Sequence, residues 1–180
     1  MKLQEYRKKP PEIVNINGAE YTLNTDFSDC IMTIEALCDE ELLDYEKIDI
    51  VMHNMYSEPY PENISEAVES AVNYLTQGRE QSEKDRKRPI VLDFEHDEQY
   101  IYDAFMRMNI DLYKTKMTWW EFNARLRELP DGCMLCRIVH WRMTPYNKLT
   151  KEEKKAIEEI GRDKVFLPKK ITATDFFEAY

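Results

Sequence analysis

Short segments of this chain repeat one pattern, an apolar side chain at every third or fourth position, which indicates amphipathic α-helices. Three such stripes lie in the first part of the chain: Phe27, Cys30, Ile31, Ile34, Leu37 and Cys38; Ile48, Val51, Met52 and Met55; Ile64, Val68, Ala71 and Leu75. Thr25 or Asp26 is placed to cap the first helix, and the prolines of SEPYPEN separate the second from the third. Three helices are therefore predicted in this part.

A β-hairpin is predicted ahead of these helices, in EIVNINGAEYTLNT. Asn17-Gly18 supplies the two residues with positive φ that a type I′ turn requires. A two-residue turn pairs Ile16 with Ala19 and leaves one apolar face of the hairpin uncovered. We expect the following helix to cover this face, because a lone hairpin is marginal in water.

Two capping boxes mark helix starts in the second part of the chain. Thr118 with Glu121 opens a helix at Trp119 that ends before the turn residues PDG, and the apolar segment CMLCRIVHW that follows is also predicted to be helical. Thr150 with Glu153 opens a charged helix that stops at glycine 161. Its apolar face is thin, so this last helix is expected to stay mostly exposed to water or to wait for a partner.

The stretch DFEHDEQYIYDAFMRMNIDL predicts one more helix, opened by Asp93 as its N-cap and closed by Asn109 in a left-handed conformation. Its apolar stripe is formed by Phe94, Ile101, Phe105 and Met108. The fold class that follows is mainly α, with a small N-terminal β-hairpin. Residues 1–77 form a hairpin plus three helices, the charged segment 78–89 is a linker, residues 90–167 form a second helical unit, and residues 168–180 form an aromatic tail.

Charge and composition limit the function. With 35 acidic against 25 basic residues the formal charge is −10, so nucleic acid and anionic membranes are not expected partners. No apolar run approaches the roughly 20 residues that span a bilayer, and the first residues lack the apolar middle of a secretion signal, so we expect a cytoplasmic location. The four cysteines are then interpreted as reduced.

The acidic start of DFEHDEQ has two interpretations. Asp93, Glu95, His96 and Asp97 offer the oxygen and nitrogen ligands of a metal site, and a metal-dependent enzyme could be centred there. Alternatively, the carboxylates only satisfy the free N–H groups and the positive dipole at the start of a helix. Helix capping is preferred, because the sequence identifies no further ligands.

Cys133 and Cys136, followed by His140, have the spacing of half a zinc site, but the other half is missing. Buried thiols are the preferred interpretation, with a metal or redox dithiol as the alternative. Only four glycines occur, so neither a Walker loop nor a G-x-G-x-x-G motif can be written, and there is no G-x-S-x-G. No reaction and no cofactor is therefore predicted, and the chain is not expected to be an enzyme.

Aromatic residues are the candidates for binding a partner. On a helix Trp119 and Trp120 point about 100° apart, so that if one faces the core the other lies at its edge. The pair either packs within the molecule or provides a half-exposed anchor for another protein. Phe176, Phe177 and Tyr180 in the tail either pack back or dock into another chain.

The stretches DFEHDEQYIYDAFMRMNIDL and MTWWEFNARLREL, with YTLNTDF upstream, resemble a family of small proteins of long-tailed bacteriophages and prophages, named after the fifteenth gene product of a Listeria phage. The resemblance covers most of residues 12–165. The matching residues are Asp93, Asp97, Ile101, Ala104, Phe105, Asn109, Ile110, Asp111, Leu112, Trp119, Trp120 and Phe122.

The resemblance implies a role in building the phage tail, because the family is encoded in the tail-gene cluster just upstream of the tape-measure protein. That gene context implies a tail assembly chaperone that coats the tape-measure protein before tail tube subunits replace it. The expected partners are the tape-measure protein and the major tail protein, with self-association left open. A structural minor tail component is the alternative, followed by the metal-dependent enzyme.

Overall fold

The structure is a computed structural model of the chain, and it describes residues 11–79 and 91–167. This part is mainly α-helical, with a two-stranded antiparallel sheet near its start. The elements in chain order are β1 (Ile13–Ile16), β2 (Ala19–Thr22), α1 (Phe27–Cys38), α2 (Asp44–Met55), α3 (Ile64–Leu75), α5 (Glu98–Arg107), α6 (Trp119–Arg127), α7 (Met134–Met143), the 3₁₀ turn η2 (Tyr146–Lys148), α8 (Lys151–Ile160) and α9 (Arg162–Val165). The predicted fold class is confirmed.

The hairpin has the predicted turn and register. Ile16 pairs with Ala19, and Asn17 and Gly18 both have positive φ. Gly18 N–H donates to the Asn15 side chain, which tightens the turn. Ile16 is buried in the core, and β1 packs against α3. The hairpin is therefore covered mainly by the third helix, and not by the helix that follows it as predicted.

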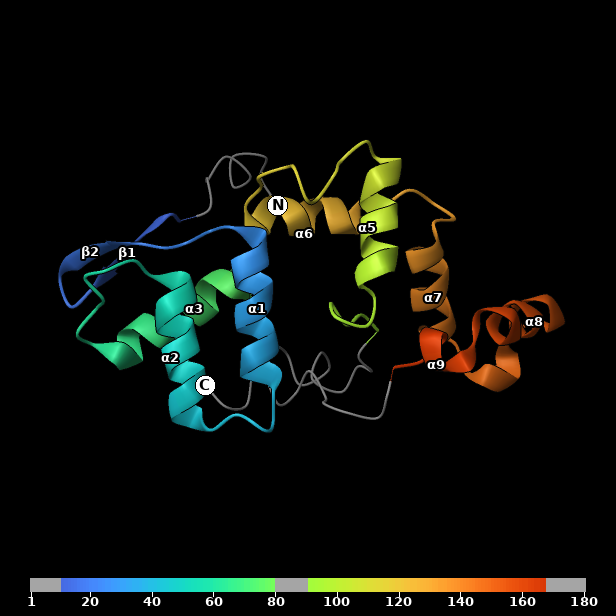
Figure 1. The fold of residues 1–180 in the computed structure, drawn as a ribbon, viewed down its shortest axis with the longest axis horizontal. Helices are drawn as coiled ribbons and strands as arrows, with labels where there is room; N and C mark the ends of the chain where they lie inside the picture. Colours follow the sequence, from blue (N-terminus) through green and yellow to red (C-terminus); the bar gives the residue numbers. More distant parts are fainter. Residues whose placement is uncertain (1–10, 80–90, 168–180) are drawn as a thin grey trace.

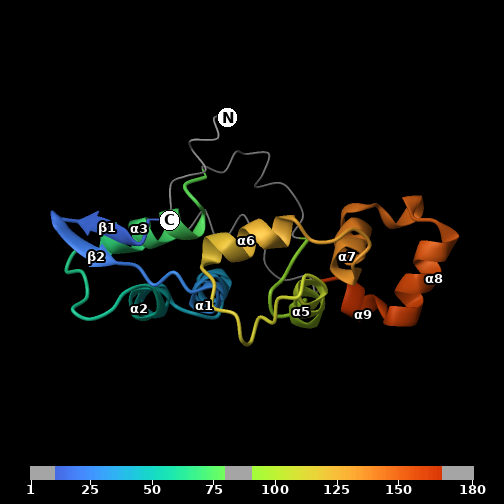
Figure 2. The ribbon, with the colours of Figure 1, turned by 90° about the horizontal axis from the view of Figure 1, so that it is seen from above.

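The helices form an elongated molecule with the hairpin at one end and α8 at the other (Figure 1). Seen from above, α2, α1 and α5 lie side by side and are viewed nearly end-on, while α6 lies across the space between α1 and α5 (Figure 2). The helix α6 packs on α1, and α7 packs on α5. The first helices of the chain are therefore joined to the later ones through α6.

A short backbone pairing fixes this junction. Asp26 and Thr118 form an antiparallel bridge in which Trp119 N–H donates to the Thr25 carbonyl at 2.8 Å and Phe27 N–H donates to the Met117 carbonyl at 3.2 Å. Asp26 and Thr118 are also the N-caps of α1 and α6. Two helices that are 92 positions apart in the sequence thus start from the same backbone bridge.

One hydrophobic core contains residues from both sides of the segment 80–90. Cys30, Val51 and Ala71 lie in it together with Phe105 and Phe122, all of them buried. The predicted linker and the division into units at 78–89 stay predictions, since most of that segment lies outside the described residues.

Most of α8 is exposed or half-buried, as predicted, but one of its side chains enters a second, smaller core formed by the last helices. Ile157 of α8 is fully buried against Trp141, Leu149 and Val165. The thin stripe is sufficient because side chains of α7 and α9, together with Leu149, pack against Ile157. The second predicted capping box is present at Thr150, as is the helix stop that follows α8.

The predicted helix start at Asp93 is wrong. The helix α5 begins at Glu98, and residues 94–97 form turns that lead into it. The predicted stop is confirmed, because Asn109 has a φ of 59° just after the helix. In the described ranges, no helix has the length and apolar content to cross a membrane.

Candidate functional site

The acidic residues at the start of α5 divide between two environments. Asp97 is fully buried, whereas Glu95 and Glu98 are exposed and line a groove. Residues 93–98 therefore contribute both to a closed cluster inside the molecule and to an open surface.

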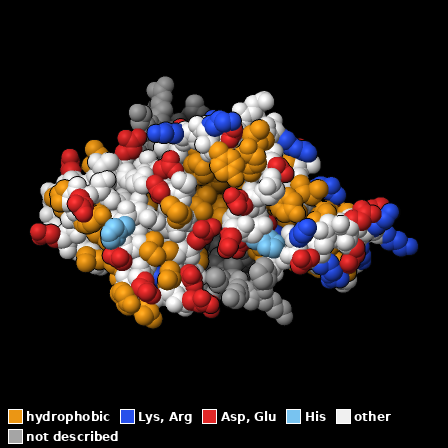
Figure 3. All heavy atoms as spheres, viewed as in Figure 1, with side chains coloured by type: hydrophobic (Ala, Val, Ile, Leu, Met, Phe, Trp, Pro, Cys, Tyr) orange, Lys and Arg blue, Asp and Glu red, His pale blue; other side chains and the backbone are white. Residues whose placement is uncertain are grey.

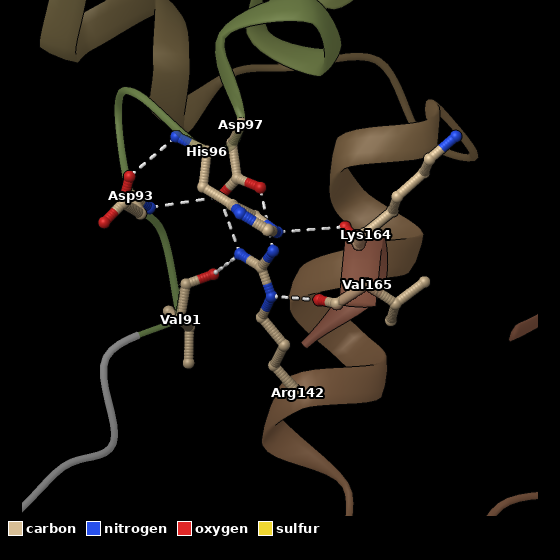
Figure 4. A network of polar contacts seen from close by, with 7 residues as sticks. All are labelled: Val91, Asp93, His96, Asp97, Arg142, Lys164 and Val165. Carbon is tan, nitrogen blue, oxygen red and sulfur yellow. Dashed lines mark hydrogen bonds and ion pairs between the residues drawn. The ribbon is translucent and has the colours of Figure 1, made fainter. Parts of the chain in front are cut away.

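The closed cluster is centred on Asp97 and Arg142, and we call it the Asp97–Arg142 cluster (Figure 4). Arg142 Nη1 and Nη2 donate to the two carboxylate oxygens of Asp97 at 2.6 and 2.8 Å. The other bonds of the guanidinium go to the carbonyl of Val165 from Nε, at 2.6 Å, and to the carbonyl of Val91 from Nη1, at 3.0 Å. Only 3 % of the Arg142 side chain and none of the Asp97 side chain is exposed, so two charges removed from water are fully paired.

The neighbouring candidates do not converge on a common point. Asp93 accepts a bond from His96 N–H at 2.7 Å, and its own N–H donates to Asp97. His96 Nε2 donates to the Lys164 carbonyl (Figure 4). Glu95 lines the groove instead. Within residues 11–79 and 91–167, no three His, Cys, Asp or Glu side chains are arranged to hold a metal ion.

The capping interpretation of this stretch is therefore incomplete. Asp93 does accept a local backbone N–H, but Asp97 neutralises a buried arginine that is 45 positions away in the sequence. The sequence contains a signal that we missed: Leu135, Ile138 and Arg142 are spaced by three and four, and the first two are buried. An arginine on the buried stripe of a helix requires a buried partner.

Cys133 and Cys136 lie together at the start of α7, with their sulfur atoms 3.2 Å apart, and both are free thiols. Cys133 is the N-cap of the helix, and its sulfur accepts a bond from Cys136 N–H. Burial and the contact with Cys133 raise the pKa of Cys136 to about 11. His140 points elsewhere and pairs with Glu153. Cys136 therefore lacks the low pKa of a reactive thiol.

The tryptophan pair packs within the molecule. Trp119 is buried and donates its indole N–H to the Leu75 carbonyl at 2.8 Å, and half-buried Trp120 donates to the Tyr74 carbonyl at 3.1 Å. Consecutive indoles thus satisfy consecutive carbonyls at the end of α3. Partner binding through Trp120 stays a prediction. Phe176, Phe177 and Tyr180, the other predicted partner-binding residues, lie outside the described residues.

A groove of about 760 Å³ opens between α1 and α5, and we call it the α1–α5 groove. Its floor is apolar, with Phe27 and Ile31 of α1, Ile101 of α5 and Phe122 of α6. Phe122 stacks on Phe27 at a ring separation of 4.9 Å. Figure 3 shows hydrophobic side chains gathered in the hollow between the two halves of the molecule, with Asp and Glu around it. The sequence did not predict this groove, since its walls come from helices on either side of the segment 80–90.

Among the described residues, the groove also holds carboxylates that have no cationic partner. Burial, and then repulsion from Glu95, Asp93 and Glu98, raises the pKa of Glu35 above its ordinary value. In the described part of the chain, Glu35, Glu95 and Glu98 form no ion pair with lysine or arginine. Lys114, on the opposite rim, is paired with Asp111 at 2.7 Å.

The fold and this site define a mainly helical protein with an N-terminal hairpin and an open apolar groove that has an acidic rim. The family model for Bacteriophage Gp15 protein matches residues 8–163, which is most of the chain. The chain belongs to this bacteriophage protein family. No curated protein and no solved structure matches it.

Proposed function

We propose that this chain is a phage tail morphogenesis factor, an assembly chaperone that binds the tape-measure protein in the host cytoplasm. The observation that carries the proposal is the α1–α5 groove, because an apolar floor with an acidic rim is suited to hold a segment of another protein. Membership of a bacteriophage family supports the setting.

The chemistry of a chaperone for a long helical protein agrees with the groove. Such a partner has an apolar stripe along each helix, which aggregates unless it is covered. Contact with Phe27, Ile31 and the exposed Met32 covers apolar surface, and the surrounding carboxylates keep the complex soluble. Binding that is partly electrostatic is weakened by competing charges, which allows tail proteins to displace the chaperone.

The test is co-expression of the chain with a fragment of the tape-measure protein encoded beside it. We expect the fragment to be soluble and to copurify with the chain, and to aggregate when expressed alone. The negative control is the same chain carrying Ile31→Asp, which places a charge in the groove floor, after circular dichroism has verified its folding. If the fragment is equally soluble with and without the wild-type chain, the proposal fails.

A structural minor tail component is the second candidate, supported by the same family membership. The two roles differ in what remains in the virion. Mass spectrometry of purified particles should find no copies of an assembly chaperone, whereas stoichiometric copies would assign the chain to the tail itself. The major tail protein, as the successor on the tape-measure protein, is proposed as a second, weaker partner.

A further inference from the structure

We infer that the α1–α5 groove takes a single amphipathic helix whose apolar stripe is about three turns long and whose Lys and Arg residues cluster at one end. This inference rests on the proposed function, since it gives the chemistry of the partner segment that the groove would hold. The helix would lie lengthwise between α1 and α5, with its basic end at Glu35, Glu95 and Glu98.

The shape of the groove argues for a helix. Its walls are α1, of 12 residues, and α5, of 10 residues, which lie side by side (Figures 1 and 2). At 1.5 Å per residue, such walls are about 15–18 Å long, or about three helical turns. Side chains at positions i, i+3 or i+4 and i+7 of a third helix would reach the floor at Phe27, Ile31 and Ile101.

The acidic and basic residues of the groove lie at opposite ends of its length. The chain runs down α1 and up α5 in Figure 1, so the last part of α1 and the start of α5 lie at the same end. Glu35, Glu95 and Glu98 gather there, and burial together with repulsion from Glu95 and Glu98 raises the pKa of Glu35. Lys116 also lines the groove, and it lies at the opposite end, because the neighbouring Met117 carbonyl accepts a bond from Phe27 N–H at the start of α1. Basic groups on the ligand would relieve the repulsion at the acidic end.

The wider surface agrees with a basic partner. Residues 11–79 contain fifteen Asp and Glu but only two Lys and Arg, a formal charge of −13, whereas residues 91–167 have a formal charge of −1, with fourteen acidic and thirteen basic residues. The strongly acidic residues 11–79 include α1, which forms one wall of the groove. A second copy of this chain would bring a net charge of −10 to the same place, so a basic segment of another protein is the better occupant.

The test uses three synthetic 18-residue peptides and the full chain. One peptide has leucine at helical spacing and lysine clustered at one end, the second has glutamate in place of each lysine, and the third has the first composition in scrambled order. Fluorescence anisotropy should show that the basic peptide binds at least about tenfold more tightly than either of the others, and that added salt weakens it. Equal binding of the basic and scrambled peptides would overturn the inference.

Two matched double variants locate the binding. Glu35→Lys with Glu98→Lys reverses charge inside the groove, and Glu62→Lys with Glu69→Lys makes the same change of net charge at exposed positions outside it. We expect about a tenfold loss of affinity for the basic peptide in the first and less than about twofold in the second. Equal losses would mean diffuse attraction to an acidic surface and would overturn the inference.

Truncation distinguishes an occupant from within the chain. Removing residues 168–180 should leave affinity for the basic peptide within about twofold, whereas a rise of more than about tenfold would make the tail the natural occupant and contradict the inference. The peptide assay is independent of the solubility assay. If the basic peptide binds the groove but the tape-measure fragment stays insoluble, the proposed function fails and the inference about the groove stands. If the fragment becomes soluble but the basic peptide does not bind, the inference about the groove fails and the proposed function stands.

Discussion

The Asp97–Arg142 cluster and the α1–α5 groove both take carboxylates from residues 93–98, yet they treat negative charge in opposite ways. In the cluster, each oxygen of Asp97 has a guanidinium donor, and the site is closed to water. In the groove, Glu95 and Glu98 face Glu35 without a described cation, over an apolar floor. The comparison teaches that charge paired inside the fold stabilises it, whereas charge left unpaired at a surface is free for a ligand.

The largest effect on stability should come from disrupting the Asp97–Arg142 cluster. Arg142→Ala leaves the buried Asp97 carboxylate and two backbone carbonyls without their donor, and we expect a loss of about 3–5 kcal/mol in the free energy of unfolding. Urea denaturation followed by circular dichroism measures it. The control is Arg137→Ala, an exposed arginine over the Trp141 ring, which should cost less than about 1 kcal/mol. Similar costs for both variants would contradict a structural role for the cluster.

The second prediction concerns the tryptophan pair, which joins α6 to the end of α3. Trp119→Phe removes the buried donor to the Leu75 carbonyl and is expected to cost about 1–3 kcal/mol of unfolding free energy. Trp120→Phe should cost less, because this ring is only half-buried. Urea denaturation provides both values. A larger loss for Trp120→Phe would show that the buried bond from Trp119 is not the main contact between α6 and α3.

The same pair separates packing from partner binding. If Trp120→Phe keeps the stability of the protein but lowers its recovery of the tape-measure fragment, then the sequence-based prediction of a half-exposed anchor is supported. Unchanged recovery would leave both rings with a purely internal role.

The smallest effect on stability is expected for a substitution in the α1–α5 groove. The pKa of Glu35 is raised in the folded chain, so the folded state binds more protons than the unfolded state over the window between the two pKa values, and stability falls as pH rises through it. Glu35→Gln should therefore increase stability at pH 7, by less than about 0.5 kcal/mol as is usual for exposed positions. The gain should vanish below the ordinary pKa of 4.5, where the carboxyl is protonated in both states.

Thermal unfolding of wild type and Glu35→Gln at a series of pH values measures this gain. Glu69→Gln on the exposed side of α3 serves as the control for removing one charge from the acidic unit. A gain at pH 7 that persists at acidic pH would show that repulsion in the groove is not its cause.

Features that depend on neighbouring residues could be predicted from the sequence. The Asn17-Gly18 turn fixes the hairpin register, and the capping boxes at Thr118 and Thr150 fix two helix starts, because each involves contacts within a few residues. The stop at Asn109 is equally local. These features determine most of the secondary structure but none of the candidate site.

Features that depend on distant residues could not be predicted in the same way. Asp97, just before the start of α5, is paired with Arg142, and Ile157 of α8 is buried against Trp141 and Val165. The groove needs α1, α5 and α6 to be placed in space. Its acidic residues look like ordinary surface charge until Glu35 is found beside the start of α5.

The central claim is that the α1–α5 groove binds the partner, whereas the Asp97–Arg142 cluster stabilises the fold. Amide chemical shifts test this claim most directly. Nitrogen-15 labelled protein is titrated with the tape-measure fragment, and shift changes are mapped along the chain. We predict the strongest changes in residues 26–35, 94–102 and 112–116, which include the groove lining, and little change in α8. The account is contradicted if α8 and α9 carry the strongest changes while the groove residues stay unperturbed.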